Sequence, residues 1–452
     1  MTSTVSRDTA IFAAVVVALG ALSGVAITSQ PWLVIGALVA IVAFPIMLNR
    51  PRAVFVLWLC SIAFIPYWIG VDVFGFMPIP SLLGLMVGAI LISKKMWIPS
   101  GWDYILAAFI GLSLLAVVID TSSRGTWFSM LTHWALAFLI GRAAIPVLGK
   151  EYTGRVFAII MSIVGGLALV EFWLSWHPFT SWAMSNGSYA AWSPIQVRGG
   201  NDRSEWAFGH SIALGGSLTL AVPFIVQGQF RTSRKILMLC LIGGGALVSL
   251  SRGGLLAVAL TVALSLYALA TVSSVQRFLI GCTSIFLGVW ALSSFAGLTA
   301  GSSRETSSSS SYRVAMHETL IPTMQMIGRA TSAQRTPSGL RFGRYQSIDS
   351  TFLILGIGFG WLVAAIAIVA FLALLVRVAL RHASAPEVAL VGQLPVLATV
   401  ALITQYQILI WLMLGMAVTF YAMSKKDRPA KKKKSDQADF SHTGVKVPAV
   451  RR

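Results

Sequence analysis

Long apolar runs separated by short polar segments make up most of this chain. Many of the runs have about 17 to 25 residues, enough for an α-helix to cross about 30 Å of hydrocarbon. Helices are expected because lipid offers no partners for free backbone N–H and C=O groups. The pattern predicts about 12 to 14 membrane spans, near residues 10–27, 31–48, 53–70, 80–93, 103–119, 129–148, 155–174, 206–227, 235–250, 253–271, 276–296, 350–376, 388–404 and 406–423.

Composition excludes an ordinary soluble protein. Hydrophobic residues make up 56% of the 452 residues, charged residues make up 11%, and the mean hydropathy is +0.80. Such values are typical of a polytopic membrane protein. Residues 1–423 are therefore predicted to form one all-α transmembrane domain. The first run has no evident cleavage site and another run follows it closely, so it is predicted to be a span and not a signal peptide.

Much of the net charge of +19 lies in a basic tail, residues 424–452, which includes four lysines at 431–434. Lysines and arginines in alternate loops fall on the same predicted side as this tail, which the positive-inside rule makes cytoplasmic. Both termini are then cytoplasmic. The tail is predicted to be disordered and to be attracted to anionic lipid, not to nucleic acid. Residues 404–407, between the last two spans, leave a re-entrant hairpin as an alternative.

Two long segments, 175–205 and 297–349, fall on the opposite, extracytoplasmic side. The longer one carries six arginines and no lysine; they are Arg304, Arg313, Arg329, Arg335, Arg341 and Arg344. The shorter one adds Arg198 and Arg203. A guanidinium keeps its charge and binds phosphate through two parallel hydrogen bonds, so the cluster predicts a diphosphate or another polyanion. The alternative is that most of these arginines pair with lipid phosphates or local carboxylates.

Several short segments, taken in order, resemble the O-antigen ligase and O-antigen polymerase superfamily of bacterial envelope proteins. The likeness covers roughly residues 195 to 375. It rests on Phe208-Gly209-His210 and Ser251-Arg252-Gly253-Gly254, each opening a span, on Ser311-Tyr312-Arg313 in the long loop, and on Ile348-Asp349-Ser350-Thr351-Phe352-Leu353 before Gly356, Gly358 and Gly360.

The resemblance implies a glycosyltransferase of the multi-span C class in the bacterial cytoplasmic membrane. It would take a glycan from an undecaprenyl diphosphate carrier at the outer leaflet and transfer it to an acceptor, either a lipid core sugar or another carrier-linked repeat. Arg252 and Arg313 would bind the diphosphate, with Arg198 or Arg203 as helpers. Prepositioned cations would stabilise the charge that grows on this leaving group. No cofactor is expected, and without a close pair of outer carboxylates a metal-free mechanism is the simpler hypothesis.

The chain departs from the ligases where they carry a histidine before a small polar residue, because Asp349-Ser350 stands there. This difference favours the polymerase type. Asp349 is the first candidate for the general base, with His317 and Glu205 as rivals. Asp349 is equally interpreted as a helix cap. His210, in the resembling turn, is as well explained as a helix-end histidine.

The remaining candidates are weaker. His133 and His177 have no evident partner, and Glu171 is an intramembrane acid that could reach the interface. The tryptophans between 173 and 206 are typical of an interfacial belt, although they could stack on sugars. Three scattered cysteines, Cys60, Cys240 and Cys282, offer neither a disulfide framework nor metal-ligand spacing. A flippase or secondary transporter of lipid-linked sugars is the alternative function.

Overall fold

The computed structural model describes residue 45 and residues 47–442, except 73–74, 95, 120, 270–272, 283, 286–302 and 337–338. For 303–310, 335–336, 339 and 427–442 it describes the backbone only. The predicted span 10–27 and most of 31–48 and 276–296 therefore lie outside the described residues. The side chains of Arg304 and Arg335 do as well.

The described chain is mostly helical and fits a multi-pass all-α membrane protein. Five helical segments in it are long and apolar enough to cross a membrane. They are α5 (Gly101–Val118), the continuous α6 (Arg124–Ser129), η1 (Met130–Ala135) and α7 (Leu136–Leu148), α8 (Lys150–Leu174), α17 (Trp361–Ala379) and the Thr404–Lys426 part of α20 (Thr404–His442). Shorter helices are α3 (Pro51–Phe64), α4 (Ile79–Ser93), α10 (Ser211–Thr219), α11 (Val222–Gln227), α12 (Thr232–Val248), α13 (Arg252–Ala268), α16 (Thr351–Phe359), α18 (Ala385–Gly392) and α19 (Leu394–Leu397).

Three predicted spans are broken into shorter helices. Pro223 stands in the first turn of α11, where its missing N–H costs nothing, and it separates α11 from α10. Gly360 separates α16 from α17 with φ 102°, a left-handed conformation that favours glycine. Residues 385–397 form α18 and α19. The break at Gly360 lies against the long loop, because the Trp361 N–H donates to the Gln325 carbonyl oxygen at 2.8 Å and the Gly328 N–H donates to the Phe359 carbonyl oxygen at 2.9 Å.

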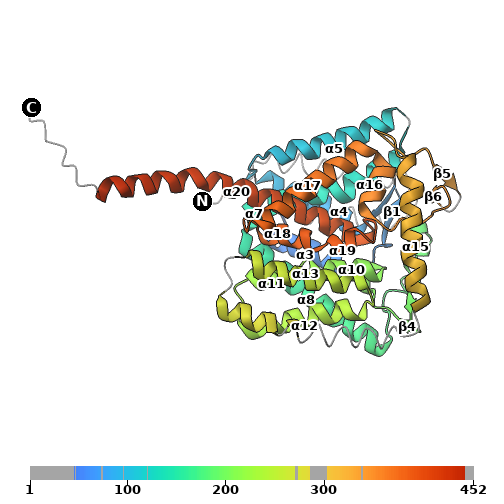
Figure 1. The fold of residues 1–452 in the computed structure, drawn as a ribbon, viewed down its shortest axis with the longest axis horizontal. Helices are drawn as coiled ribbons and strands as arrows, with labels where there is room; N and C mark the ends of the chain where they lie inside the picture. The colour runs from blue at the N-terminus through green and yellow to red at the C-terminus, as the bar shows by residue number, and fades with distance from the viewer. Residues whose placement is uncertain are drawn as a thin grey trace, which may run out of the picture.

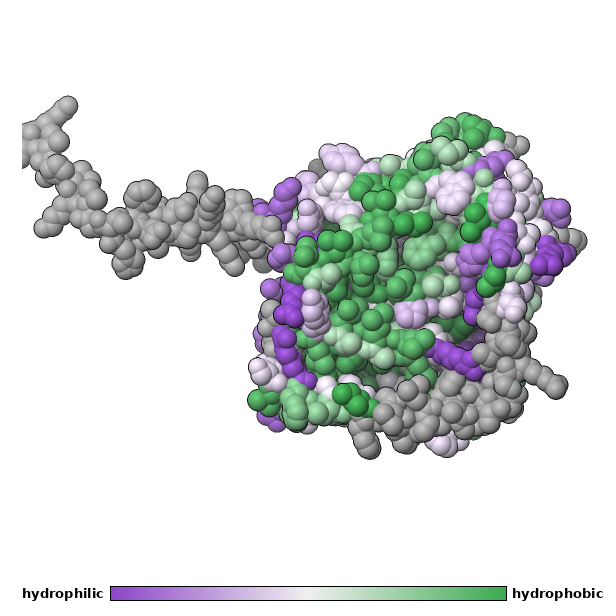
Figure 2. All heavy atoms as spheres, viewed as in Figure 1, coloured by the Kyte–Doolittle hydropathy of each residue, from purple (hydrophilic) through white to green (hydrophobic). Residues whose placement is uncertain are grey.

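The polar connections gather at one end of the bundle. Figure 1 shows α15 (Ser303–Leu320), the hairpin of β5 (Ala333–Thr336) and β6 (Gly339–Phe342), and β4 (Asn201–Asp202) at one end, whereas α20 leaves from the other. Figure 2 shows a broad hydrophobic face bordered by hydrophilic residues at both ends. The arginine-rich segments therefore lie opposite the basic C-terminal segment. We call this the arginine end.

Several short elements fill the connections at the bundle ends. They are β1 (Gly70–Asp72), β2 (Phe76–Pro78), α9 (Gly187–Trp192), β3 (Val197–Arg198), η2 (Trp206–Phe208) and η4 (Ile321–Thr323). The strands pair only as antiparallel hairpins, β1 with β2, β3 with β4 and β5 with β6. Residues 424–442, expected to be disordered, instead continue α20 as a helix. Lysine is the most frequent residue there, and it favours helix.

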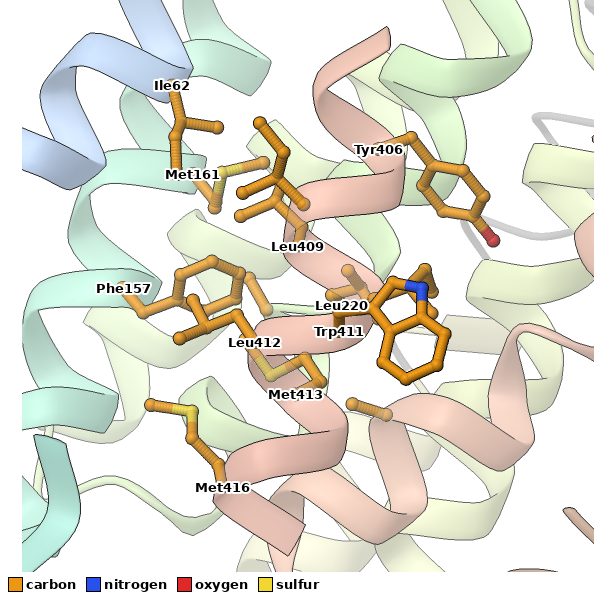
Figure 3. Close-up of a cluster of buried hydrophobic side chains, with 14 of the residues drawn as sticks. Ile62, Phe157, Met161, Leu220, Tyr406, Leu409, Trp411, Leu412, Met413 and Met416 are labelled. Atoms are coloured by element: carbon orange, nitrogen blue, oxygen red, sulfur yellow. The ribbon is translucent and has the colours of Figure 1, made fainter. Parts of the chain in front are cut away.

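The core of the bundle forms around α20. Figure 3 shows Leu409, Leu412, Met413 and Met416 of α20 packed with side chains that include Phe157 of α8. On another face, α20 lies so close to α7 that a Cβ on Gly141 would meet the Leu412 carbonyl oxygen at 2.3 Å. Small residues allow such close approach of membrane helices. This packing holds together helices that are far apart in the sequence.

A buried ion pair joins three of these helices near the end from which α20 leaves. Arg142 of α7, 1% exposed, donates to both Asp103 carboxylate oxygens at 2.8 and 2.9 Å, and to the Thr419 hydroxyl at 2.9 Å. We expect Arg142→Ala to lower the free energy of unfolding by about 3 to 5 kcal/mol, because it leaves the Asp103 charge without its partner. Thermal unfolding in detergent measures this. Arg155→Ala, at an exposed position of α8, should change little, and an equal loss in both variants would contradict the role of the pair.

Candidate functional site at the arginine end

Two arginines hold the turn between α12 and α13. Arg203 donates from Nε to the Ser249 carbonyl oxygen at 2.9 Å, and Arg198 donates from Nη1 to the Leu250 carbonyl oxygen at 2.9 Å. Leu250 has φ 48°, a left-handed conformation that is costly for leucine. The two guanidinium groups satisfy the carbonyls of this strained turn. Arg252, the third predicted phosphate ligand, is the first residue of α13 directly beyond it.

Neighbouring polar groups fix this arrangement, which we call the arginine turn (Arg198, Arg203 and Arg252). Ser251 caps α13, because its hydroxyl accepts from the Gly254 N–H at 3.1 Å. The Gln196 side-chain oxygen accepts from Arg203 at 3.2 Å and from the Ser211 hydroxyl at 2.7 Å. The turn is therefore tied to α10 as well as to α12 and α13. Cations held in this way are positioned before a ligand arrives.

The fourth predicted phosphate ligand lies in a separate pair. Arg313 Nη2 is 3.7 Å from Asp349 Oδ2, and both side chains are 29% exposed. The Ser347 hydroxyl donates to Asp349 Oδ1 at 3.2 Å. His317, one turn after Arg313 on α15, donates from Nδ1 to the Arg313 carbonyl oxygen at 2.9 Å. Asp349 thus holds Arg313 near the surface of the arginine end.

The cap of α16 is Ser350, not Asp349. The Ser350 hydroxyl accepts from the Leu353 N–H, so the interpretation of Asp349 as the helix cap is wrong. Both serine and aspartate are good N-caps, and the sequence could not choose between adjacent residues. Asp349 is left with its carboxylate directed to Arg313 and Ser347.

The starts of α13 and α16 approach two consecutive residues. A Cβ on Gly253, next to Arg252, would lie 3.1 Å from the Thr399 hydroxyl. The Thr351 hydroxyl donates to the carbonyl oxygen of the following residue, Val400, at 2.8 Å. The segment after α19 therefore connects the arginine turn with the Arg313–Asp349 pair.

A buried acidic cluster lies behind the arginine turn. Glu171, at the end of α8 and 1% exposed, accepts from His177 Nδ1 at 3.0 Å. Its other oxygen accepts from the backbone N–H groups of Trp206 at 2.9 Å and Glu205 at 3.2 Å. Glu171 therefore does not extend to the interface, and His177 has a partner. The sequence offered only a weak sign of this contact, an intramembrane acid six residues before a histidine.

Glu205 is the most strongly perturbed of the predicted base candidates. It is 1% exposed, and its Oε1 accepts from the Gln196 N–H at 3.0 Å. Burial raises the pKa of Glu205 to about 7, and the positive charge of Arg203 opposes this shift. The Glu171 carboxylate raises the pKa of His177 through their hydrogen bond. Glu205 therefore exchanges its proton near neutral pH, and His177 holds its proton more tightly than a free imidazole does.

This cluster predicts how stability depends on pH. A raised pKa means that the folded protein binds the proton more tightly, so Glu205 stabilises the fold at low pH and loses this effect as pH rises from 4.5 through about 7. We expect the thermal midpoint to fall over this range, and Glu205→Gln to flatten the fall. Glu151→Gln, at the exposed start of α8, should keep the wild-type slope. If the thermal midpoint of Glu205→Gln falls with pH as steeply as that of the wild type, the raised pKa of Glu205 is contradicted.

His210 is explained by structure alone. Its Nδ1 accepts from the Ile212 N–H at 3.2 Å and caps α10, and its ring lies edge-on to Trp192. The tryptophans divide into two groups. Trp173 and Trp176 are 76% and 50% exposed, as expected for an interfacial belt, whereas Trp206 is buried against Phe179.

Comparisons with known proteins give no relative. No family model matches the sequence, and no curated protein or solved structure matches the chain. The site geometry and the sequence motifs are therefore the basis on which a function can be proposed.

Proposed function

We propose that this protein is an integral-membrane glycosyltransferase that transfers a glycan from an undecaprenyl diphosphate carrier to a sugar hydroxyl, as the O-antigen polymerases and ligases do. The arginine turn is the observation that carries this proposal. Its Arg198 and Arg203 are anchored on backbone carbonyls at the start of α13, beside Arg252. This end of the bundle lies opposite the basic α20 extension (Figure 1), which the positive-inside rule assigns to the cytoplasm.

The arrangement suits a leaving diphosphate. Negative charge grows on the diphosphate as its bond to the sugar breaks, and fixed guanidinium groups stabilise that charge without reorganising. Arginine is the residue of choice because its planar fork matches two phosphate oxygens. In our proposal the arginine turn binds the diphosphate. In the same proposal Arg313, held by Asp349 on the long loop, binds the diphosphate as a further cation.

Three groups compete for the role of proton acceptor. His317 donates from Nδ1 to its own helix, which leaves Nε2 as its acceptor, but it has no link to the arginine turn in the described contacts; Asp349 is engaged by Arg313 and Ser347. Glu205 is buried, is linked electrostatically to Arg203, and has a pKa of about 7. A general base works best when its pKa is near the working pH. We therefore propose Glu205 as the proton acceptor and Asp349 as the residue that positions Arg313.

Transport of lipid-linked sugars is the second candidate function. The broken helices α10–α11, α16–α17 and α18–α19 are the observation that favours it, because transporters often build their sites from discontinuous helices. The proposed site residues, however, lie outside the turns that break these helices, at the start of α13 and on the two arginine-bearing loops. Labelling of a cysteine at position 252 with an impermeant reagent tests both functions, since surface chemistry requires labelling from outside only.

A binding measurement tests the proposed ligand directly. The purified protein in nanodiscs is exposed to undecaprenyl diphosphate and to undecaprenyl monophosphate, and the bound lipid is counted by native mass spectrometry. We expect the diphosphate to be preferred, because the extra phosphate adds charge-assisted hydrogen bonds. Arg252→Ala should remove the preference without unfolding the protein. Equal binding of both lipids by the wild type would contradict a diphosphate site.

A further inference from the structure

A small cavity separates Glu205 from His177. Glu171, His177 and Glu205 line it together with apolar and aromatic residues, among them Trp68, Trp192 and Trp206. It has room for about one water molecule. Polar cavities of this size hold water when at least two hydrogen-bonding groups face them.

One of these groups is His177. Its Nδ1 must carry a hydrogen, because it donates to the Glu171 carboxylate at 3.0 Å. In the neutral ring Nε2 is then the acceptor. This atom is buried, and it has no hydrogen-bond partner among the described residues. It lies 3.7 Å from Asp202 Oδ2, whose side chain is 53% exposed.

The other group is Glu205. Its Oε1 is occupied by the Gln196 N–H, whereas Oε2 is buried and also lacks a hydrogen-bond partner in the described part of the chain. Buried polar atoms without partners are rare, and an unseen water is a common explanation. Here two such atoms belong to residues that line one cavity. A water between them would satisfy both.

We propose that Glu205, one cavity water and the Glu171–His177 pair form a proton relay that connects the arginine turn with solvent at Asp202. Its role in catalysis rests on the proposed function, whereas the sharing of protons between Glu205 and His177 does not. Glu171 is a positioning residue, because it sets the tautomer of His177 and stabilises the imidazolium, much as a carboxylate orients the histidine of a catalytic triad.

The transfer step then balances. The acceptor hydroxyl oxygen bonds to the anomeric carbon while the bond from that carbon to the diphosphate oxygen breaks, and its electron pair leaves with the diphosphate. The hydroxyl proton passes to Glu205. Glu205 passes it through the water to His177 Nε2, and the imidazolium releases it past Asp202 to solvent. No oxidant, reductant or further reactant is needed.

Four charged groups face this relay. Glu171 of α8, Asp202 of β4 and Glu205 all raise the pKa of His177. Arg203 lowers the pKa of Glu205, whereas Glu171 raises it. Removing either glutamate charge should therefore make His177 easier to deprotonate. This effect of Glu205 on His177 across the cavity is the coupling that a relay requires and that two independent buried groups would lack.

Histidine titration by NMR tests the relay without any substrate. The chain has six histidines, so uniformly labelled histidine gives few signals, and His177→Asn identifies the one that matters. We expect the His177 midpoint to lie above its ordinary value of 6.5, to fall by about one pH unit in Glu171→Gln, and to fall less in Glu205→Gln. Glu151→Gln, at the far end of α8, is the matched control and should change nothing.

The outcomes separate the relay from the proposed function. An unchanged His177 midpoint in Glu205→Gln would overturn the relay, whatever the protein catalyses. If Glu171→Gln fails to fold, Glu205→Gln still makes this test. Where transfer activity is measured, the rate should fall at acidic pH, because His177 must be neutral to accept a proton. In Glu171→Gln this fall should begin at a lower pH than in the wild type. A coupled His177 in a protein without transfer activity would uphold the relay and reject the glycosyltransferase.

Discussion

Replacing Arg252 with lysine is expected to lower the rate of glycan transfer by about 10- to 100-fold, equivalent to the loss of a charge-assisted hydrogen bond. Lysine keeps the charge but not the planar fork that holds two phosphate oxygens. Arg252 is the first residue of α13, whose cap is Ser251, so the helix start should survive the change. Expression and the thermal midpoint should therefore stay close to wild type.

Arg341→Lys is the matched control for this prediction. Arg341 lies on β6 in the long loop, at the same end of the bundle as Arg252, and it donates to the Arg344 carbonyl oxygen at 3.2 Å in an exposed position. The same exchange there should leave transfer within about twofold of wild type, as expected for an exposed contact. Near-normal turnover in Arg252→Lys would contradict the proposal that Arg252 binds phosphate through two hydrogen bonds. Equal losses in both variants would mean that transfer depends on arginine at this end in general and not on Arg252 in particular.

The second large effect is expected from Glu205→Gln. Turnover should fall by about 100- to 10,000-fold, the usual contribution of a general base, with a smaller change in KM. Glutamine preserves the shape and can still accept from the Gln196 N–H. The wild-type rate should rise with pH through about 7, because Glu205 must lose its proton before it can accept another. That limb should disappear in the variant.

Asp349→Asn provides the comparison for Glu205. If Asp349 only positions Arg313, its asparagine variant should bind the carrier more weakly and keep the pH limb near 7. If Asp349 is itself the base, the large loss of turnover and the loss of the pH limb should both occur in Asp349→Asn instead. The two variants together thus assign the proton acceptor.

Hydrophobic pattern predicted most of the fold. Each predicted span within the described residues coincides with one apolar helix or with two consecutive ones, because apolar length is dictated by the bilayer. The breaks at Gly360 and Pro223 were not predicted. The run 350–376 is apolar on both sides of Gly360 and holds two further glycines, so hydropathy alone does not reveal where the backbone turns.

The site was predicted only in part. The sequence pointed to Arg252, Arg198 and Arg203 as phosphate ligands and to Glu205 as a rival base. The structure brings Arg198, Arg203 and Glu205 together around Ser249, Leu250 and Gln196. The contact between Glu171 and His177 could not be predicted, because it depends on the loop after α8 folding back onto the helix end. The spacing of residues along the sequence does not show that this loop folds back. Its path is fixed by hydrogen bonds between backbone and side-chain groups.

Reconstitution tests the central claim most directly. The purified protein in liposomes is given native lipid-linked oligosaccharide, the products are resolved on a gel, and the released carrier diphosphate is assayed, with Arg252→Ala as the control. We predict a ladder of longer glycans, or a single transfer product, together with released diphosphate, and neither in the variant. Carrier that crosses the bilayer with no glycan transfer would contradict the glycosyltransferase and make this protein a transporter.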